Sequence, residues 1–390
     1  MLNALLKRFN HHRKEKYFQS PLFHAQKTYA FVGFGIHSMT SLYPILRHFN
    51  IRLKYICTKN TDWKNQLSPL FPGCSFIHEL QPILDDDTVA GVFVCTTPEA
   101  HYDILTRLLK AGKPVFIEKP PCQTLDQLNQ LITIPPAAIC TVGLQRRHWP
   151  GNRAIVKKCR EAISYCYQFQ TGPLAEGDPF TELFIHPLDY AQYLFGEATL
   201  ESFSKHEDNK GVTLQLHLTH PGRDGKHSGS AGNAGRTGNA SGHPRSISGL
   251  LHLSTNYTWN PPVESLSVNT TAESLTIQYP TTVTGKQLPF RVLNIPTERV
   301  LGQAAVTKEY FSGIPTLTPA QETNTLYTQG FLPEIEHFVS LVENRRPSSG
   351  TTSGTNSRVN PNNNGGASND LPSLLNLYQL LEKLRKPPVG

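Results

Sequence analysis

Two short stretches of the sequence place ionisable side chains where they could move a proton. In "VFIEKPP" (residues 115–121) an apolar, strand-like run ends in Glu118 and Lys119, followed by two prolines. A lysine that a stiff turn holds partly away from water has a lowered pKa, and its ammonium can hydrogen-bond or protonate a carbonyl oxygen. From these residues alone, a surface ion pair that ends a strand is an equal alternative.

The second stretch is "TELFIHPLDY" (residues 181–190), in which Glu182 and His186 are four residues apart and Asp189 follows three later. In a helix all three lie on one face. An imidazole oriented by a carboxylate one turn away is a general base suited to a hydroxyl proton. A capping glutamate and a packing histidine would produce the same spacing, so the helix alone does not decide between the two readings.

The segment "YAFVGFGIHSMTSLYPIL" has the pattern of a dinucleotide-binding turn. Gly33, Gly35 and Ser38 occupy the G-x-G-x-x-G/A positions between an apolar strand and a segment that can form a helix. Gly33 would make the tight bend, Gly35 would let the backbone approach a pyrophosphate, and Ser38 would permit close helix packing. We predict that the cofactor contacts Gly33, Phe34, Gly35, Ile36, His37 and Ser38; the alternative is a glycine-rich turn without a ligand.

The end of the next strand, "LKYICTKNTDWK", bears on the choice of cofactor. A carboxylate there would bind the ribose 2′-hydroxyl of NAD, but the chain offers Thr58 and Lys59 and no carboxylate before Asp62. A hydroxyl and a cation suit a 2′-phosphate, so the pattern favours NADP over NAD. The alternative is that Lys59 points into solvent.

A further strand ends in "CTTPEAHYD", at the sheet edge where open α/β folds bind ligands. Proline stops the strand, and the next helix begins with His101 in its first turn. We predict that this edge and the end of the neighbouring strand add six cofactor contacts: Thr96, Thr97, Pro98, His101, Glu118 and Lys119. A histidine in that position is also a common packing or capping residue.

The elements that would position these residues follow from the hydrophobic pattern. Between residues 28 and 145, short continuous apolar runs alternate with helix-like segments, which predicts parallel strands with crossover helices in a Rossmann domain. Residues 146–345 contain one helical stretch and several period-2 segments, which predict an α+β domain with a mostly antiparallel, open sheet. The predicted fold class is therefore α/β with two domains.

Three further segments have distinct composition. Residues 1–27 contain six Lys or Arg against one Glu, so we predict a basic arm, either solvated or in contact with an anionic membrane surface or a partner. Residues 221–248 and 346–370 are low in complexity and are predicted to be a flexible insertion and a disordered linker. Residues 371–390 are predicted to form a C-terminal helix.

Overall composition excludes several classes of protein. The net charge of +7 is concentrated in the basic arm, so the body is nearly neutral and no nucleic-acid partner is expected. The seven cysteines are odd in number and never spaced CxxC, which argues against a disulfide framework and against a metal site. No apolar window of about 18 residues and no signal peptide are evident. We therefore expect a cytoplasmic protein without an integral membrane segment.

Together these motifs resemble the Gfo/Idh/MocA oxidoreductase family, which includes glucose-fructose oxidoreductase and inositol dehydrogenase. The resemblance covers about residues 28–347, and its most specific part is "CTTPEAHYDILTRLLKAGKPVFIEKP". The other matching stretches are "GFGIHS", "VGLQRRH", "ELFIHPLDYAQYLFG", "ESLSVNTTAESLTI" and "GFLPEIEHFVSLVENRRP".

The resemblance implies roles for three residues. The family's EKP lysine corresponds to Lys119, and its helix histidine corresponds to His186. The aspartate usual one turn before that histidine is replaced by Glu182, which keeps the charge but adds a methylene. Relatives commonly have a cis bond at the position of Lys119 and Pro120. In the family the open C-terminal sheet often forms dimers or tetramers, which implies a homo-oligomer here.

The function implied is NAD(P)-dependent hydride transfer between nicotinamide and a secondary alcohol or ketone of a sugar, polyol or sugar derivative. The catalytic residues would be Lys119, His186 and Glu182, and the small-molecule substrate would contact Arg146, Arg147 and Asp189. One alternative is a dinucleotide-binding sensor or scaffold without turnover. Another is an offshoot that uses a tightly held cofactor transiently, for epimerisation or glycoside cleavage.

Overall fold

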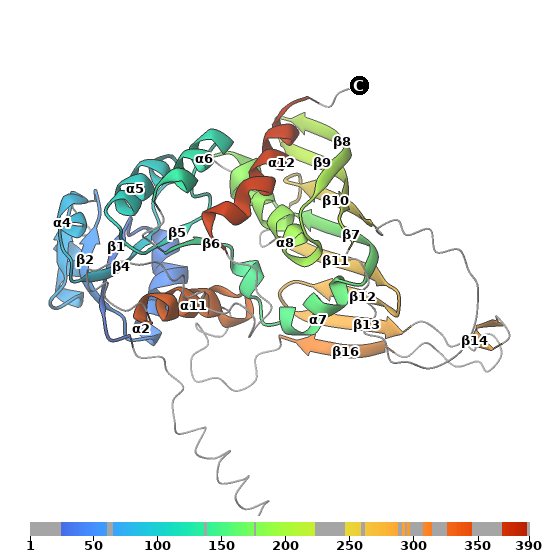
Figure 1. Cartoon of the computed structure of the whole chain (residues 1–390), viewed down its shortest axis with the longest axis horizontal. Helices are drawn as coiled ribbons and strands as arrows, with labels where there is room; N and C mark the ends of the chain where they lie inside the picture. The colour runs from blue at the N-terminus through green and yellow to red at the C-terminus, as the bar shows by residue number, and fades with distance from the viewer. Residues whose placement is uncertain are drawn as a thin grey trace, which may run out of the picture.

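The computed structural model describes most of the chain, except for the ends and several internal stretches. The described residues are 25–60, 65–135, 139–174, 177–222, 246–258, 262–287, 291–292, 295–296, 307–313, 326–344 and 369–387. The predicted basic arm up to residue 24, the insertion between 223 and 245 and the linker up to residue 368 lie outside this set. Two large sheets stand side by side, with helices between and around them (Figure 1).

The first sheet contains six strands in the order β3-β2-β1-β4-β5-β6, and all neighbouring pairs are parallel. This is the strand order of a Rossmann sheet and confirms the predicted N-terminal domain. The inner strands β1, β4 and β5 are largely apolar and buried because both faces of the sheet are covered. Their bounds are β1 Thr28–Val32, β2 Arg52–Cys57, β3 Ser75–Ile77, β4 Val89–Val94, β5 Val115–Glu118 and β6 Cys140–Gly143.

Crossover helices follow most of these strands. The longest, α5 (Pro98–Lys110), begins with a proline at its first position, where a missing N–H costs nothing. It ends at Lys110, and Gly112 just beyond its C-cap has the positive φ of +67° that favours glycine. The others are a π-helical turn η1 (Ser38–Leu42) continued by α2 (Tyr43–His48), the short η2 (Ser68–Leu70) and α4 (Gln81–Leu84), and α6 (Leu125–Thr133).

One face of the Rossmann sheet is covered by a helix from much later in the chain, α11 (Phe331–Glu343). Phe338 packs its ring against Phe93 and Phe116, with ring centroids 5.3 and 5.9 Å apart. The buried cluster around them joins β1, β4, β5, α2 and α11. Our division at residue 145 assigned α11 to the second domain, but the packing places it on the first (Figure 1).

The second sheet has eight strands in the order β16-β13-β12-β11-β7-β10-β9-β8, antiparallel except between β7 and β10. It confirms the predicted mostly antiparallel sheet. The bounds are β7 Ala162–Gln170, β8 Thr199–Asp208, β9 Gly211–His220, β10 Ile247–Ser254, β11 Val263–Thr270, β12 Glu273–Gln278, β13 Thr282–Gln287 and β16 Thr307–Ser312. A separate two-stranded ribbon joins β14 (Arg291–Val292) to β15 (Ile295–Pro296).

The face of this sheet toward the Rossmann domain is covered by α7 (Asn152–Cys159), α8 (Ile185–Phe195) and α12 (Leu375–Arg385), as Figure 1 shows. No helix among the described residues covers the other face (Figure 1). This face carries a shallow cavity of about 300 Å³, whose lining includes four serines and Leu250, which is 57% exposed. Among the described residues no helix combines the length and the apolar character needed to cross a bilayer.

Candidate active site

The turn after β5 fixes Lys119 in place. The bond between Lys119 and Pro120 is cis, as the family resemblance implied. The side chain of His101, only 1% exposed, bonds the Pro120 carbonyl through Nδ1 at 2.7 Å. Because a carbonyl can only accept, Nδ1 must carry the proton. His101 therefore supports the turn from within α5, and a direct contact with the cofactor stays a prediction.

Lys119 reaches from this turn to the segment that carries His186. Its ammonium donates a hydrogen bond of 2.9 Å to the backbone carbonyl of Glu182. Burial lowers the pKa of Lys119 below its usual 10.5, although Glu118 and Glu182 oppose this shift. Two of its three N–H groups have no partner among the described residues, so they remain available to an oxygen atom of a substrate.

His186 stands at the start of α8, directly after a π-helical turn, η4 (Phe180–Phe184). Burial lowers its pKa well below 6.5, and the nearby positive charges of Arg146, Lys119 and His37 lower it further. The imidazole is therefore neutral at neutral pH, as a general base must be. Within the described part of the chain no hydrogen bond holds the ring.

The position of Glu182 differs from our expectation. Its carboxylate accepts a hydrogen bond from the backbone N–H of Asp178 at 3.2 Å, four residues back, and folds over Gly177. No bond joins Glu182 to His186 among the described residues. The π-helical turn explains this, because its wider winding rotates position 182 away from the face it would share with position 186 in an α-helix. Glu182 contributes its carbonyl to Lys119 instead.

Arg146 lies in the short helix η3 (Gln145–His148) and is held by a residue of the second sheet. Its Nε and Nη2 bond the carboxylate of Glu264 at 2.7 to 3.1 Å, and its guanidinium lies 4.9 Å from the ring centroid of Tyr279. The remaining Nη1 is buried and has no hydrogen-bond partner in the part of the chain that the structure describes. Since Arg146 lies near both Lys119 and His186, this orphaned donor suits an oxygen atom of a substrate.

Arg147 and Asp189 bond each other. The guanidinium of Arg147 makes a bidentate pair with the Asp189 carboxylate at 2.5 to 3.2 Å, and both side chains are at most 5% exposed. We expected both residues to contact the substrate. This ion pair joins η3 to α8, and a contact of either side chain with the substrate stays a prediction.

The glycine turn has the shape of a phosphate-binding loop. Gly33 has a φ of +84°, and a Cβ there would lie 2.3 Å from Thr96 and 2.4 Å from the Cys95 carbonyl, so only glycine fits. Around Gly35, in contrast, no atom lies within 4 Å of the place a Cβ would take. The fully buried Ser38 donates to the Gly35 carbonyl at 2.7 Å. The turn is thus closed at Gly33 against the residues that follow β4, and open at Gly35, where a pyrophosphate would approach.

The glycine turn also meets the strand that carries Lys119. The Nε2 atom of His37 lies 3.7 Å from Oε1 of the buried Glu118, and this oxygen accepts no hydrogen bond from any described residue. An unpaired buried carboxylate oxygen between the two turns is a ready acceptor for a ribose hydroxyl. Among the other predicted contacts, Thr97 occupies the N-cap position of α5 without a side-chain capping bond, between Thr96 and Pro98. Lys59 is exposed after the buried Thr58.

Comparisons with known proteins agree with this geometry. Residues 27–144 match the family model GFO_IDH_MocA, described as an oxidoreductase family with an NAD-binding Rossmann fold. The chain carries the Rossmann domain of the Gfo/Idh/MocA family. It is 27% identical over 194 residues to the uncharacterized oxidoreductase YhhX of Escherichia coli, covering 43% of this chain and 53% of that protein.

A second relative of this Gfo/Idh/MocA domain is the NAD(+) scyllo-inositol 2-dehydrogenase of Bacillus subtilis. It is 29% identical over 138 residues, covering 32% of this chain and 40% of that enzyme. The chain therefore spans about half the length of the curated relatives it matches, or less. A dehydrogenase structure from Chromobacterium violaceum shares the fold over 92% of this chain and 94% of its own, with a TM-score of 0.66 and 15% identity.

Two buried acidic residues near the site were not predicted from the sequence, although a signal was present for each. Glu264 is an acidic residue at an inward position of β11, in phase with the buried Leu266 and Val268. Glu334 interrupts the apolar stripe of α11. It is fully buried, and its Oε1 accepts hydrogen bonds from the backbone N–H of Leu144 and from Asn369 at 2.5 and 3.2 Å. Burial raises its pKa well above 4.5, and the charge of Glu118 adds to that shift.

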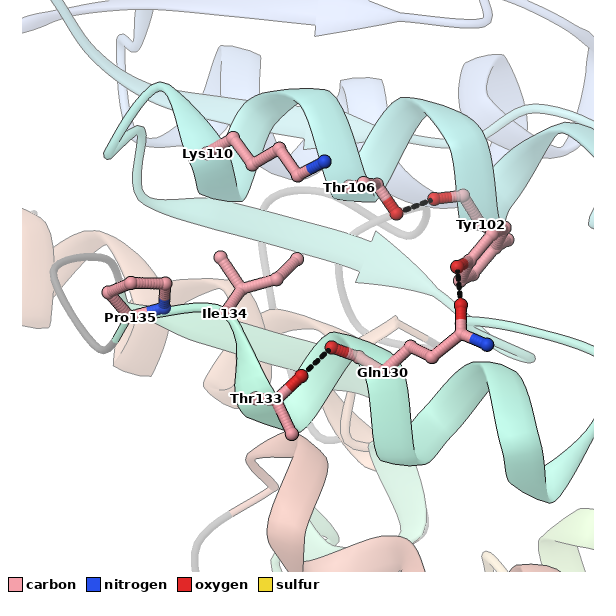
Figure 2. A pocket seen from close by; sticks show the side chains of 7 residues that line it. All are labelled: Tyr102, Thr106, Lys110, Gln130, Thr133, Ile134 and Pro135. Carbon is pink, nitrogen blue, oxygen red and sulfur yellow. Dashed lines mark hydrogen bonds between the residues drawn. The ribbon is translucent and has the colours of Figure 1, made fainter.

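One cavity lies apart from this site. A cavity of about 340 Å³ opens between α5 and α6, where the Tyr102 hydroxyl bonds Gln130 (Figure 2). None of the residues lining it belongs to the predicted site, and the hydroxyl groups of Thr106 and Thr133 bond carbonyls of their own helices. Among the described residues no group of three or more His, Cys, Asp and Glu side chains could hold a metal ion.

Proposed function

We propose that this protein is an NAD(P)-dependent oxidoreductase that interconverts a secondary alcohol and a ketone of a sugar, polyol or sugar derivative. The observation that carries the proposal is the hydrogen bond from the Lys119 ammonium to the Glu182 carbonyl. This bond joins the turn at Glu118, Lys119 and Pro120, which we call the EKP turn, to the segment that leads into the His186 helix, at the carboxyl edge of a Rossmann sheet. The match to an NAD-binding oxidoreductase family supports it.

The residues present fit a nicotinamide dinucleotide. The open space at Gly35 suits the pyrophosphate, and the unpartnered Glu118 oxygen suits a ribose hydroxyl. We propose that Thr58 and Lys59 favour NADP, since a hydroxyl and an exposed cation follow β2. When bound, the cofactor would supply the hydride acceptor or donor.

In the oxidative direction His186 would take the proton of the substrate hydroxyl, because its imidazole is neutral and unbonded. Lys119 would donate an N–H to the same oxygen and stabilise the negative charge that develops there. The buried Nη1 of Arg146 would bond a second oxygen of the substrate and so orient the carbon to be oxidised. Glu182 would act on Lys119 through its carbonyl, while its carboxylate fixes the turn.

We propose that the open face of the second sheet forms a homo-oligomer, since small side chains there would let a second sheet approach closely. Sedimentation equilibrium tests this proposal. A monomer at micromolar concentration would contradict it without touching the proposed chemistry.

The proposed reaction is tested by titrating the protein with NAD+ and NADP+, then following nicotinamide absorbance over a panel of polyols, sugars and keto-sugars. We expect tight dinucleotide binding by both the wild type and Lys119→Ala, with hydride transfer only in the wild type. Tight binding without hydride transfer on any substrate of the panel would point instead to a sensor.

A further inference from the structure

The C-terminal helix α12 crosses the junction between the two segments that carry the proposed catalytic residues. Figure 1 shows it lying against both α6 and α8. Its buried side makes polar contacts to the turn after Lys119: the Tyr378 hydroxyl donates to the Cys122 carbonyl at 2.6 Å, and Glu382 accepts from the Leu125 N–H at 3.3 Å. Since Lys119 is only three residues before Cys122, these contacts of α12 support the EKP turn.

Arg385, the last residue of α12, contacts both segments at once. One arm of its guanidinium, Nη1, donates to the Gln123 carbonyl at 3.3 Å. The other arm, Nη2, forms an ion pair with the Asp178 carboxylate. Residue 123 follows the EKP turn and residue 178 precedes the π-helical turn, so this single side chain joins the two.

Asp178 in turn organises the segment that leads to His186. Its carboxylate accepts from the Phe180 N–H at 3.1 Å and from the Thr181 hydroxyl at 2.8 Å, and its own N–H donates to the Glu182 carboxylate. The Glu182 carbonyl then receives the Lys119 ammonium. A closed loop of contacts therefore runs from Lys119 through Glu182, Asp178, Arg385 and Gln123 back to the EKP turn.

We propose that Arg385 is a positioning residue: by binding Asp178 and the Gln123 carbonyl together, it holds Lys119 and His186 at the separation that the reaction needs. This rests on the proposed function. The placement of a reacting group to within about 1 Å can change a rate by about a hundredfold. A planar guanidinium with two diverging donors can serve both partners, whereas a lysine ammonium at the same position can serve only one well.

The test compares Arg385→Ala and Arg385→Lys with Lys383→Ala, an exposed residue on the same helix. We expect Arg385→Ala to lower kcat by about tenfold or more with little change in the Kd of the dinucleotide, because the glycine turn is not part of the loop of contacts. Arg385→Lys should recover part of the loss, and Lys383→Ala should match the wild type. Equal kcat values for Arg385→Ala and Lys383→Ala would overturn the proposal.

A second measurement is independent of turnover. Hydrogen exchange of the amides of Phe180 and Glu182, both bonded to Asp178, should quicken in Arg385→Ala and stay unchanged in Lys383→Ala. Unchanged amide hydrogen exchange in Arg385→Ala would refute the positioning role of Arg385 even if no substrate were known. Faster amide exchange in Arg385→Ala, together with no hydride transfer in the wild type, would support the link that Arg385 makes and reject the proposed reaction.

Discussion

At the scale of single residues, the site combines a lysine that is easily deprotonated with a histidine that is hard to protonate. Burial is the main cause of both shifts, since it disfavours the charged form of each side chain. The two side chains nevertheless play opposite parts. Lys119 must keep its proton to stabilise an oxygen, and His186 must lack one to accept the hydroxyl proton.

The pH dependence of turnover follows from these two shifts. Activity should persist well below pH 6.5, because His186 stays neutral there, and it should fall as pH rises through the lowered pKa of Lys119. In Lys119→Arg the alkaline fall should disappear, since a guanidinium keeps its charge, while kcat at neutral pH drops by about tenfold to a hundredfold. Measuring kcat as a function of pH for the wild type and for Lys119→Arg tests this prediction. An alkaline limb unchanged in Lys119→Arg would show that another group titrates there.

At the scale of elements, two π-helical turns lie in the segments that form the candidate site. One follows the glycine turn and the other precedes His186, and π-helical turns are frequent at functional sites. The sequence predicted both helices, but its 3.6-residue periodicity cannot reveal an extra residue in one turn. Hence Glu182 was expected to bond His186 and was found bonded to Asp178.

The glycine turn supplies a prediction for an element. In Gly33→Ala, the added Cβ would combine a φ of +84° with contacts of 2.3 and 2.4 Å to Thr96 and Cys95, which follow β4. We therefore expect a loss of more than about 3 kcal/mol in the free energy of unfolding and weakened dinucleotide binding. Gly73→Ala is the matched control, since its φ is +82° and nothing lies within 4 Å; strain alone should cost it about 1 to 2 kcal/mol. Chemical denaturation and dinucleotide titration distinguish the two. Equal losses would contradict the close packing of Gly33.

At the scale of the whole molecule, the sequence predicted the two sheets because continuous and alternating hydrophobicity are local patterns. The return of α11 to the Rossmann sheet was not predictable in this way. The apolar stripe of α11 indicates that the helix packs against another element but does not identify that element. Phe338 and Phe93 are far apart in the chain, and no sequence pattern indicates that they are in contact. The buried pair of Arg147 and Asp189 was missed for the same reason, since charge alone suggested a ligand.

The docking of α11 gives a prediction about the whole fold. Phe338 is fully buried between Phe93 and Phe116, so Phe338→Ala should lower the free energy of unfolding by about 3 to 5 kcal/mol. Glu336→Ala, on a more exposed side of α11, should cost less than about 1 kcal/mol. Urea unfolding followed by circular dichroism measures both. Similar small losses in both variants would mean that α11 does not stabilise the Rossmann domain.

The central claim is that Lys119 and His186 act on the same substrate oxygen, and a double-mutant cycle on kcat tests it most directly. Residues that act as a unit lose their contribution together, so Lys119→Met and His186→Asn should each lower kcat by about a hundredfold or more. The double variant should then be little slower than the slower single variant. Multiplied losses in the double variant, or a near-wild-type rate in either single variant, would contradict the claim.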